Sequence, residues 1–119
     1  DFCLSRGLGD VYKRQGLYVS RNTKDLYVTN RAGGAITVIR FATRRVVAVW
    51  PVPGTPDMGG VSPDGRVFWV AGRYSGAVYA ISTRTGRLIA SIPVGVSPHG
   101  LCVWPQPGRY STGHTGVMR

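Results

Sequence analysis

The feature that most constrains this sequence is an internal repeat of 42 residues. Gly34 and Gly76 lie 42 positions apart, and the stretches around them align without a gap. Identical residues recur at this spacing, at the pairs Val28/Val70, Arg31/Arg73, Ala35/Ala77, Ile39/Ile81, Thr43/Thr85, Arg45/Arg87, Ala48/Ala90, Pro51/Pro93 and Pro56/Pro98. Self-similarity at a fixed period indicates that each stretch forms the same structural unit and that the units pack on one another.

Each repeat contains four short stretches rich in Val and Ile and separated by turn residues, which predict strands. We expect strands at 16–20, 26–30, 35–41 and 45–52, and again at 58–62, 67–71, 77–82 and 87–94. Four strands in about forty residues are typical of a β-propeller blade. The predicted fold is all-β: a partial β-propeller with about two four-stranded antiparallel blades plus one innermost strand of a third.

The repeat also divides the chain. Residues 1–15 do not fit it and resemble translated read-through of a sequencing adapter, so we predict a non-native, unstructured leader. The blades are expected at 16–57 and 58–99, followed by a closing strand at 100–104 and a loop-like tail up to residue 119. Rings need about four to eight blades, so we expect the remaining blades to belong to the same full-length chain.

One turn is predicted to differ between the two blades. Residues 63–66 read P-D-G-R, in which Pro presets φ and Gly supplies a positive φ. The equivalent residues 21–24 read R-N-T-K and lack both. We therefore expect the first turn to be looser. Asp25 and Asp64 lie at these turns and are expected to be structural.

Composition limits the classes of function. The net charge is +10, with 15 Lys and Arg against 5 Asp and Glu, which favours anionic partners. No apolar run approaches the roughly twenty residues of a membrane helix. The two cysteines, Cys3 and Cys102, have neither metal-site nor disulfide-framework spacing. Cys102 lies between apolar residues and is predicted to be a buried, inert thiol.

The motifs also resemble a known family. Tyr27–Asn30 reads Y-V-T-N, and A-I-T-V-I and V-S-P-D-G-R follow at 35–39 and 61–66. Residues 16–119 resemble the YVTN-repeat β-propellers of the YncE-like group. The resemblance implies a propeller and an extracytoplasmic location, whether periplasmic, cell-surface or secreted. Similar blades occur in surface-layer proteins, in quinoprotein-like dehydrogenase subunits and in nitrous-oxide reductase, so the motif is weak evidence for function.

Two residues are candidates for a ligand site at the mouth of the channel. Asp57 and His99 occupy equivalent positions one blade apart, in loops that enter innermost strands. A carboxylate and an imidazole there could act as acid and base or as two metal ligands. Each could instead hydrogen-bond only the loop backbone. We expect a rim that binds a small ligand or a protein, with no catalytic residue, metal or cofactor held by this chain.

Arginines that recur in register suggest a second kind of site. Arg31, Arg73, Arg45 and Arg87 are candidates for binding a polyanion such as single-stranded nucleic acid, with nearby aromatic residues as stacking partners. The aromatic residues considered are Tyr18, Tyr27, Trp69, Tyr74 and Tyr79. The alternative is a solvated arginine surface with aromatic residues that pack blade against blade.

Three functions therefore remain open. The first is a non-catalytic binding or scaffold propeller of the cell envelope. The second is a polyanion binder that uses the arginine-rich hairpins. The third is the propeller subunit of a redox enzyme whose cofactor ligands lie in other blades.

Overall fold

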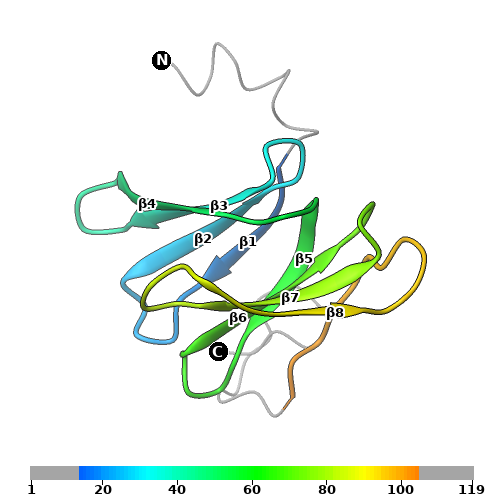
Figure 1. Cartoon of the computed structure of the whole chain (residues 1–119). Coiled ribbons are helices and arrows are strands. Elements are labelled where there is room, and N and C mark those ends of the chain that lie inside the picture. Colours follow the sequence, from blue (N-terminus) through cyan, green and yellow to red (C-terminus); the bar gives the residue numbers. More distant parts are fainter. Residues whose placement is uncertain (1–13, 105–119) are drawn as a thin grey trace.

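The computed structural model describes residues 14–104, which form two four-stranded antiparallel sheets and no helix. Each sheet follows chain order from its innermost to its outermost strand (Figure 1). The first blade contains β1 (Arg14–Val19), β2 (Asp25–Asn30), β3 (Ala35–Arg40) and β4 (Arg45–Pro51). The second contains β5 (Pro56–Val61), β6 (Val67–Gly72), β7 (Ala77–Ser82) and β8 (Leu88–Pro93). The predicted partial propeller is confirmed.

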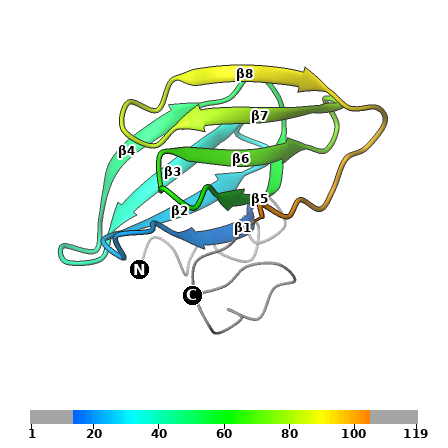
Figure 2. The same cartoon turned by 90° about the horizontal axis from the view of Figure 1, so that it is seen from below.

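The two blades are the same unit down to the pairing register. Leu26 pairs with Ile39 in the first blade, and Phe68 pairs with Ile81 at the equivalent place in the second. The innermost strands β1 and β5 lie side by side (Figure 2). The sheets therefore meet at their inner strands, as blades do around a common axis.

The turn expected to be looser has the same hydrogen-bond pattern as its counterpart. Ser20 Oγ donates to Asn22 Oδ1 at 2.7 Å, and Ser62 Oγ donates to Asp64 Oδ1 at 2.6 Å. In each turn the same side-chain oxygen then accepts a backbone N–H at 3.0 Å. Thr23 has a positive φ of 63°, and Gly65 has one of 75° at the equivalent place in the second blade. The prediction was wrong because Asn can replace Asp as the acceptor in this turn.

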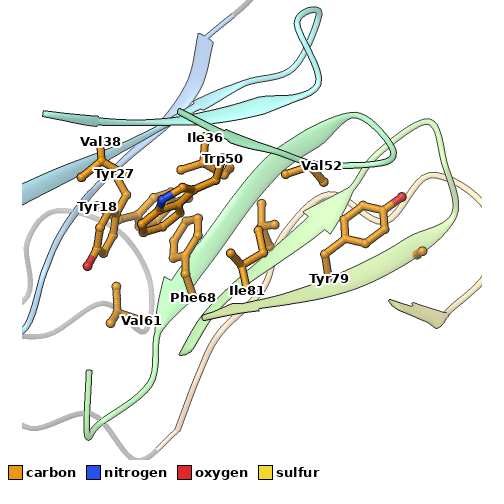
Figure 3. Packing of buried hydrophobic residues seen from close by; sticks show 12 residues of the cluster. Tyr18, Tyr27, Ile36, Val38, Trp50, Val52, Val61, Phe68, Tyr79 and Ile81 are labelled. Atoms are coloured by element: carbon orange, nitrogen blue, oxygen red, sulfur yellow. The ribbon is translucent and has the colours of Figure 1, made fainter. Parts of the chain in front are cut away.

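The main core lies between the two blades. From the first blade it takes Tyr18, Tyr27, Ile36, Val38, Trp50 and Val52, and from the second Val61, Phe68, Val70, Ala77, Tyr79 and Ile81. Figure 3 shows the Phe68 ring facing the aromatic side chains of the first blade. Its centroid lies 5.3 Å from that of Tyr18 and 5.5 Å from that of Tyr27, within the range of favourable tilted aromatic pairs.

A buried hydrogen bond joins the innermost strands of the two blades. The backbone N–H of Gly59 in β5 donates to the Tyr18 hydroxyl oxygen of β1 at 2.7 Å. Burial raises the pKa of Tyr18 above its ordinary value. The buried hydroxyl thus has a partner in the neighbouring blade.

The two ends of the described chain differ from the predictions. β1 begins at Arg14, two residues before the predicted start of the first blade at residue 16, and residues 1–13 lie outside the described residues, as does the tail 105–119. Residues 100–104 form no strand, because no second strand of their own blade lies beside them among the described residues. Cys102 in this segment is exposed, so its predicted burial was wrong. Val103 nevertheless lies close to Gly60 of β5, on the flank where a third blade would pack.

Candidate functional site

The structure brings Asp57 and His99 into direct contact. Asp57 is the second residue of β5, where the register with β6 shifts between Pro56 and Gly59, and its side chain is fully buried. His99 lies in the segment that follows β8. Its Nδ1 is 2.8 Å from Asp57 Oδ2, and its side chain is 54% exposed. The equivalent repeat positions therefore converge at one end of the sheets, as adjacent blades require.

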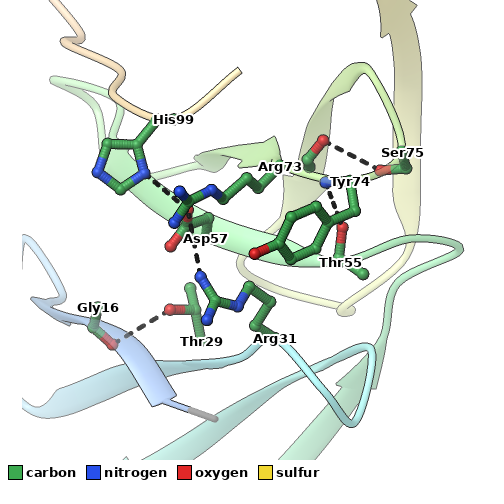
Figure 4. Close-up of polar contacts among 10 residues, drawn as sticks. Gly16, Thr29, Arg31, Thr55, Asp57, Arg73, Tyr74, Ser75 and His99 are labelled. Atoms are coloured by element: carbon green, nitrogen blue, oxygen red, sulfur yellow. Dashed lines mark hydrogen bonds and ion pairs between the residues drawn. The ribbon is translucent and has the colours of Figure 1, made fainter. Parts of the chain in front are cut away.

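Two arginines lie beside this pair of residues. Both were predicted to belong to a different, polyanion-binding site. Arg31 follows β2 and Arg73 follows β6, each at the start of an equivalent hairpin. The Nη1 atom of each lies 3.9 Å from the same Asp57 oxygen (Figure 4). We call Arg31, Asp57, Arg73 and His99 the rim cluster. The exact 42-residue spacing of the arginines was the signal that could have placed them there.

Tyr74 connects the two guanidinium groups. Its ring lies between the two arginine side chains in Figure 4, with the guanidinium carbons of Arg31 and Arg73 at 5.4 and 5.5 Å from the ring centroid. These distances are within the range of a cation–π interaction. The Tyr74 backbone N–H donates to Thr55 Oγ1 at 2.8 Å, which ties this hairpin to the loop before β5. Both guanidinium groups therefore contact the same aromatic ring, that of Tyr74.

The rim cluster carries a positive charge. Two guanidinium groups carry one positive charge each, and the single carboxylate of Asp57 neutralises only one of them. The second carboxylate oxygen, Asp57 Oδ1, is buried and has no hydrogen-bond partner among the described residues. The side chains of Arg73 and His99 are 37% and 54% exposed, so solutes can reach both. An exposed group of donors with excess positive charge favours anions.

The other two candidate arginines lie at the opposite end of the sheets. Arg45 begins β4 and Arg87 precedes β8, next to the turns that connect strands 1–2 and 3–4 of each blade. Among the described residues this end carries Arg21, Lys24, Arg40, Arg44, Arg45, Arg66, Arg84 and Arg87, against the carboxylates Asp25 and Asp64. We call these eight cations the basic end. The four repeated arginines therefore do not lie at one end of the sheets, because consecutive hairpins of an antiparallel blade face opposite ends.

The carboxylates of the basic end have structural roles. Asp25 accepts from Arg40 Nε at 3.0 Å. Asp64 accepts from Ser62 Oγ and from the backbone N–H of Arg66, and these hydrogen bonds lower its pKa. Both residues were expected to be structural, and these contacts agree.

The aromatic residues are mostly packed between the blades. Tyr18, Tyr27 and Tyr79 are buried, Trp69 is half-buried and Tyr74 is exposed at the rim. Within the described chain, Phe41 is the aromatic residue exposed beside the basic end. The alternative of aromatic packing within and between blades therefore holds for the buried tyrosines, and these cannot stack on nucleic acid bases.

No group of three or more His, Cys, Asp or Glu side chains suited to a metal ion occurs within residues 14–104. No helix in that part of the chain could cross a membrane.

Comparison with known proteins agrees with this architecture. The family model described as "YNCE-like beta-propeller" matches residues 14–108. The chain belongs to this family. Its YNCE-like fold resembles hydrazine synthase of Kuenenia stuttgartiensis, with a TM-score of 0.70 and 25% identity over 74% of this chain and 25% of that one.

Two further solved structures are similar in fold. Dihydro-heme d1 dehydrogenase NirN matches with a TM-score of 0.61 and 24% identity, over 71% of this YNCE-like chain and 19% of NirN. A luciferin-regenerating enzyme matches at 0.62 and 19%, over 75% and 33%. The chain therefore spans a third or less of these proteins. The curated proteins contain no significant match.

Proposed function

We propose that this chain is the ligand-binding part of a non-catalytic YNCE-like propeller and that its rim cluster binds an anionic ligand. The observation that carries the proposal is the convergence of two guanidinium groups on one buried carboxylate oxygen, at 3.9 Å each. Asp57 orients the arginines and neutralises half of their charge. The remaining charge attracts a carboxylate or phosphate group, which guanidinium groups bind well because their planar donors match its oxygens.

The resemblance of its motifs also supports a wider role for the protein. We place it outside the cytoplasm, in the cell envelope or secreted. The likeness to hydrazine synthase at 25% identity also favours a role as the propeller part of a redox enzyme, with cofactor ligands in blades outside this chain. An anion-binding rim is compatible with either role.

Replacing Arg73 by Gln is expected to weaken the binding of inorganic phosphate at least fivefold. The substitution removes a charged donor from the cluster, and hydrogen bonds to charged groups contribute about 1.5–3 kcal/mol. Phosphate is titrated into the isotopically labelled chain, and amide shifts of residues 73–76 and 99–101 are followed by NMR. The matched control is Arg87→Gln, which removes the same charge at the basic end. Equal effects of the two substitutions, or no saturable shifts in the unsubstituted chain, would contradict the proposal.

A polyanion-binding role is a second candidate, and the eight cations of the basic end favour it. We expect this end, with Arg45 and Arg87, to bind a nucleic acid through its phosphates. Binding of labelled oligothymidine, measured by fluorescence anisotropy, should fall steeply between 50 and 200 mM salt, on the order of tenfold or more. The double substitution Arg45→Gln and Arg87→Gln should reduce the slope. Binding that is insensitive to salt would exclude this candidate.

A further inference from the structure

The contact between His99 and Asp57 determines which imidazole nitrogen faces the ligand. An ionised carboxylate has no proton to donate, so Asp57 Oδ2 accepts and His99 Nδ1 donates across the 2.8 Å contact. In a neutral imidazole the other nitrogen, Nε2, then has no proton and is an acceptor. Figure 4 shows this second nitrogen pointing away from Asp57. The buried aspartate thus holds His99 in a single tautomer.

The other charged side chains of the rim cluster offer a ligand no exposed hydrogen-bond acceptor. Arg31 and Arg73 are donors only, because a guanidinium group has five N–H groups and no acceptor. Asp57 is fully buried, so its own acceptors do not face solvent. Among these four side chains, the exposed donors come from arginine and the exposed acceptor is His99 Nε2. A ligand that satisfies all of them has an anionic acceptor and, close to it, a hydrogen-bond donor.

We propose that the rim cluster selects small hydroxycarboxylates, with the carboxylate on the guanidinium groups and the hydroxyl donating to His99 Nε2. This inference rests on the proposed anion-binding function and names its ligand class. An ammonium group could also donate to Nε2. The site already has two guanidinium groups and one carboxylate, however, and this excess positive charge disfavours a further cation. A neutral hydroxyl meets the same need without repulsion.

The test compares lactate with propionate, which differ by one hydroxyl group. Both are titrated into the full chain at pH 7.5 and followed by NMR. Lactate is expected to bind about fivefold more tightly, the effect of one added hydrogen bond. Two variants distinguish the role of the Nδ1 donor of His99 from that of its Nε2 acceptor. His99→Asn keeps a donor where Nδ1 lies but has no acceptor at the Nε2 position, so the preference for lactate should disappear. His99→Gln places its amide near the Nε2 position and should keep part of the preference.

A spectroscopic measurement tests the tautomer independently of binding. Long-range ¹H–¹⁵N spectra of the neutral imidazole should show His99 Nε2 without a proton and Nδ1 with one, and His114→Gln assigns the signals of the other histidine. In Asp57→Asn the side-chain amide can also accept from Nδ1 or donate to it, so the signals should move toward a mixture of tautomers.

Each outcome of these experiments either supports or overturns the hydroxycarboxylate inference. Equal binding of lactate and propionate, a lactate preference that survives in His99→Asn, or a proton on Nε2 overturns the hydroxycarboxylate inference, and phosphate binding would still support the anion site. Loss of phosphate binding as well would overturn both. A preference for lactate that needs His99 and the observed tautomer supports the inference.

Discussion

The variant Phe68→Ala is expected to lower the free energy of unfolding by about 3–5 kcal/mol. The Phe68 ring is completely buried and contacts Tyr18 and Tyr27 of the other blade. Truncation removes apolar area from the core and leaves a cavity between two sheets that cannot easily collapse, because each is held by its own backbone ladder. The loss should therefore separate the blades before it disrupts either sheet.

Urea unfolding followed by tryptophan fluorescence measures this effect, since Trp50 lies in the same core. The control is Leu17→Ala, which truncates a smaller apolar side chain on β1 that is 68% exposed. Its expected cost is below about 1 kcal/mol. If Phe68→Ala costs no more than Leu17→Ala, the core between the blades is not the main source of stability.

The variant Gly59→Ala is expected to destabilise the chain by about 1–3 kcal/mol and to weaken the rim cluster as well. A Cβ at position 59 would collide with the backbone carbonyl oxygen of Trp69 on the paired strand β6. Backbone cannot move aside as a flexible side chain does, so β5 must shift. That shift disturbs the hydrogen bond from Gly59 to Tyr18. It also displaces Asp57, which precedes Gly59 by two residues.

Thermal unfolding and the phosphate titration read out the two consequences together. Gly33→Ala is the matched control, because the nearest atom to its added Cβ lies at 3.8 Å, an ordinary contact. We expect the control to retain both stability and phosphate affinity. A Gly59→Ala chain that unfolds at the normal temperature would show that β5 and β6 are not held as closely as the structure has them.

Part of the candidate site could be predicted before any coordinates. Asp57 and His99 share a repeat position, so adjacent blades had to bring them to the same end of the sheets. Arg31 and Arg73 also share a repeat position and lie at that end, but repeat spacing does not reveal their contact with Asp57. Residue type alone grouped them with Arg45 and Arg87, which the antiparallel hairpins place at the opposite end.

Local composition does not determine structure where a segment lacks neighbouring strands. Residues 100–104 have the composition of an innermost strand, and Cys102 has apolar neighbours in sequence. A strand forms only where a second one pairs with it, and a side chain is buried only where another layer covers it. Within the described chain the segment has no paired strand and Cys102 is not covered, so composition did not decide the structure of this segment.

The sequence by itself determined the repeating unit, the four strands of each blade and the spacing that stacks one blade on the next. A period of 42 residues specifies these, since equivalent residues fold into equivalent local structure. Only the tertiary structure decided that two arginines converge on one buried carboxylate and that an exposed imidazole presents a particular nitrogen. Those features depend on side-chain directions and on distances between residues of different blades, and repeat spacing alone specifies neither.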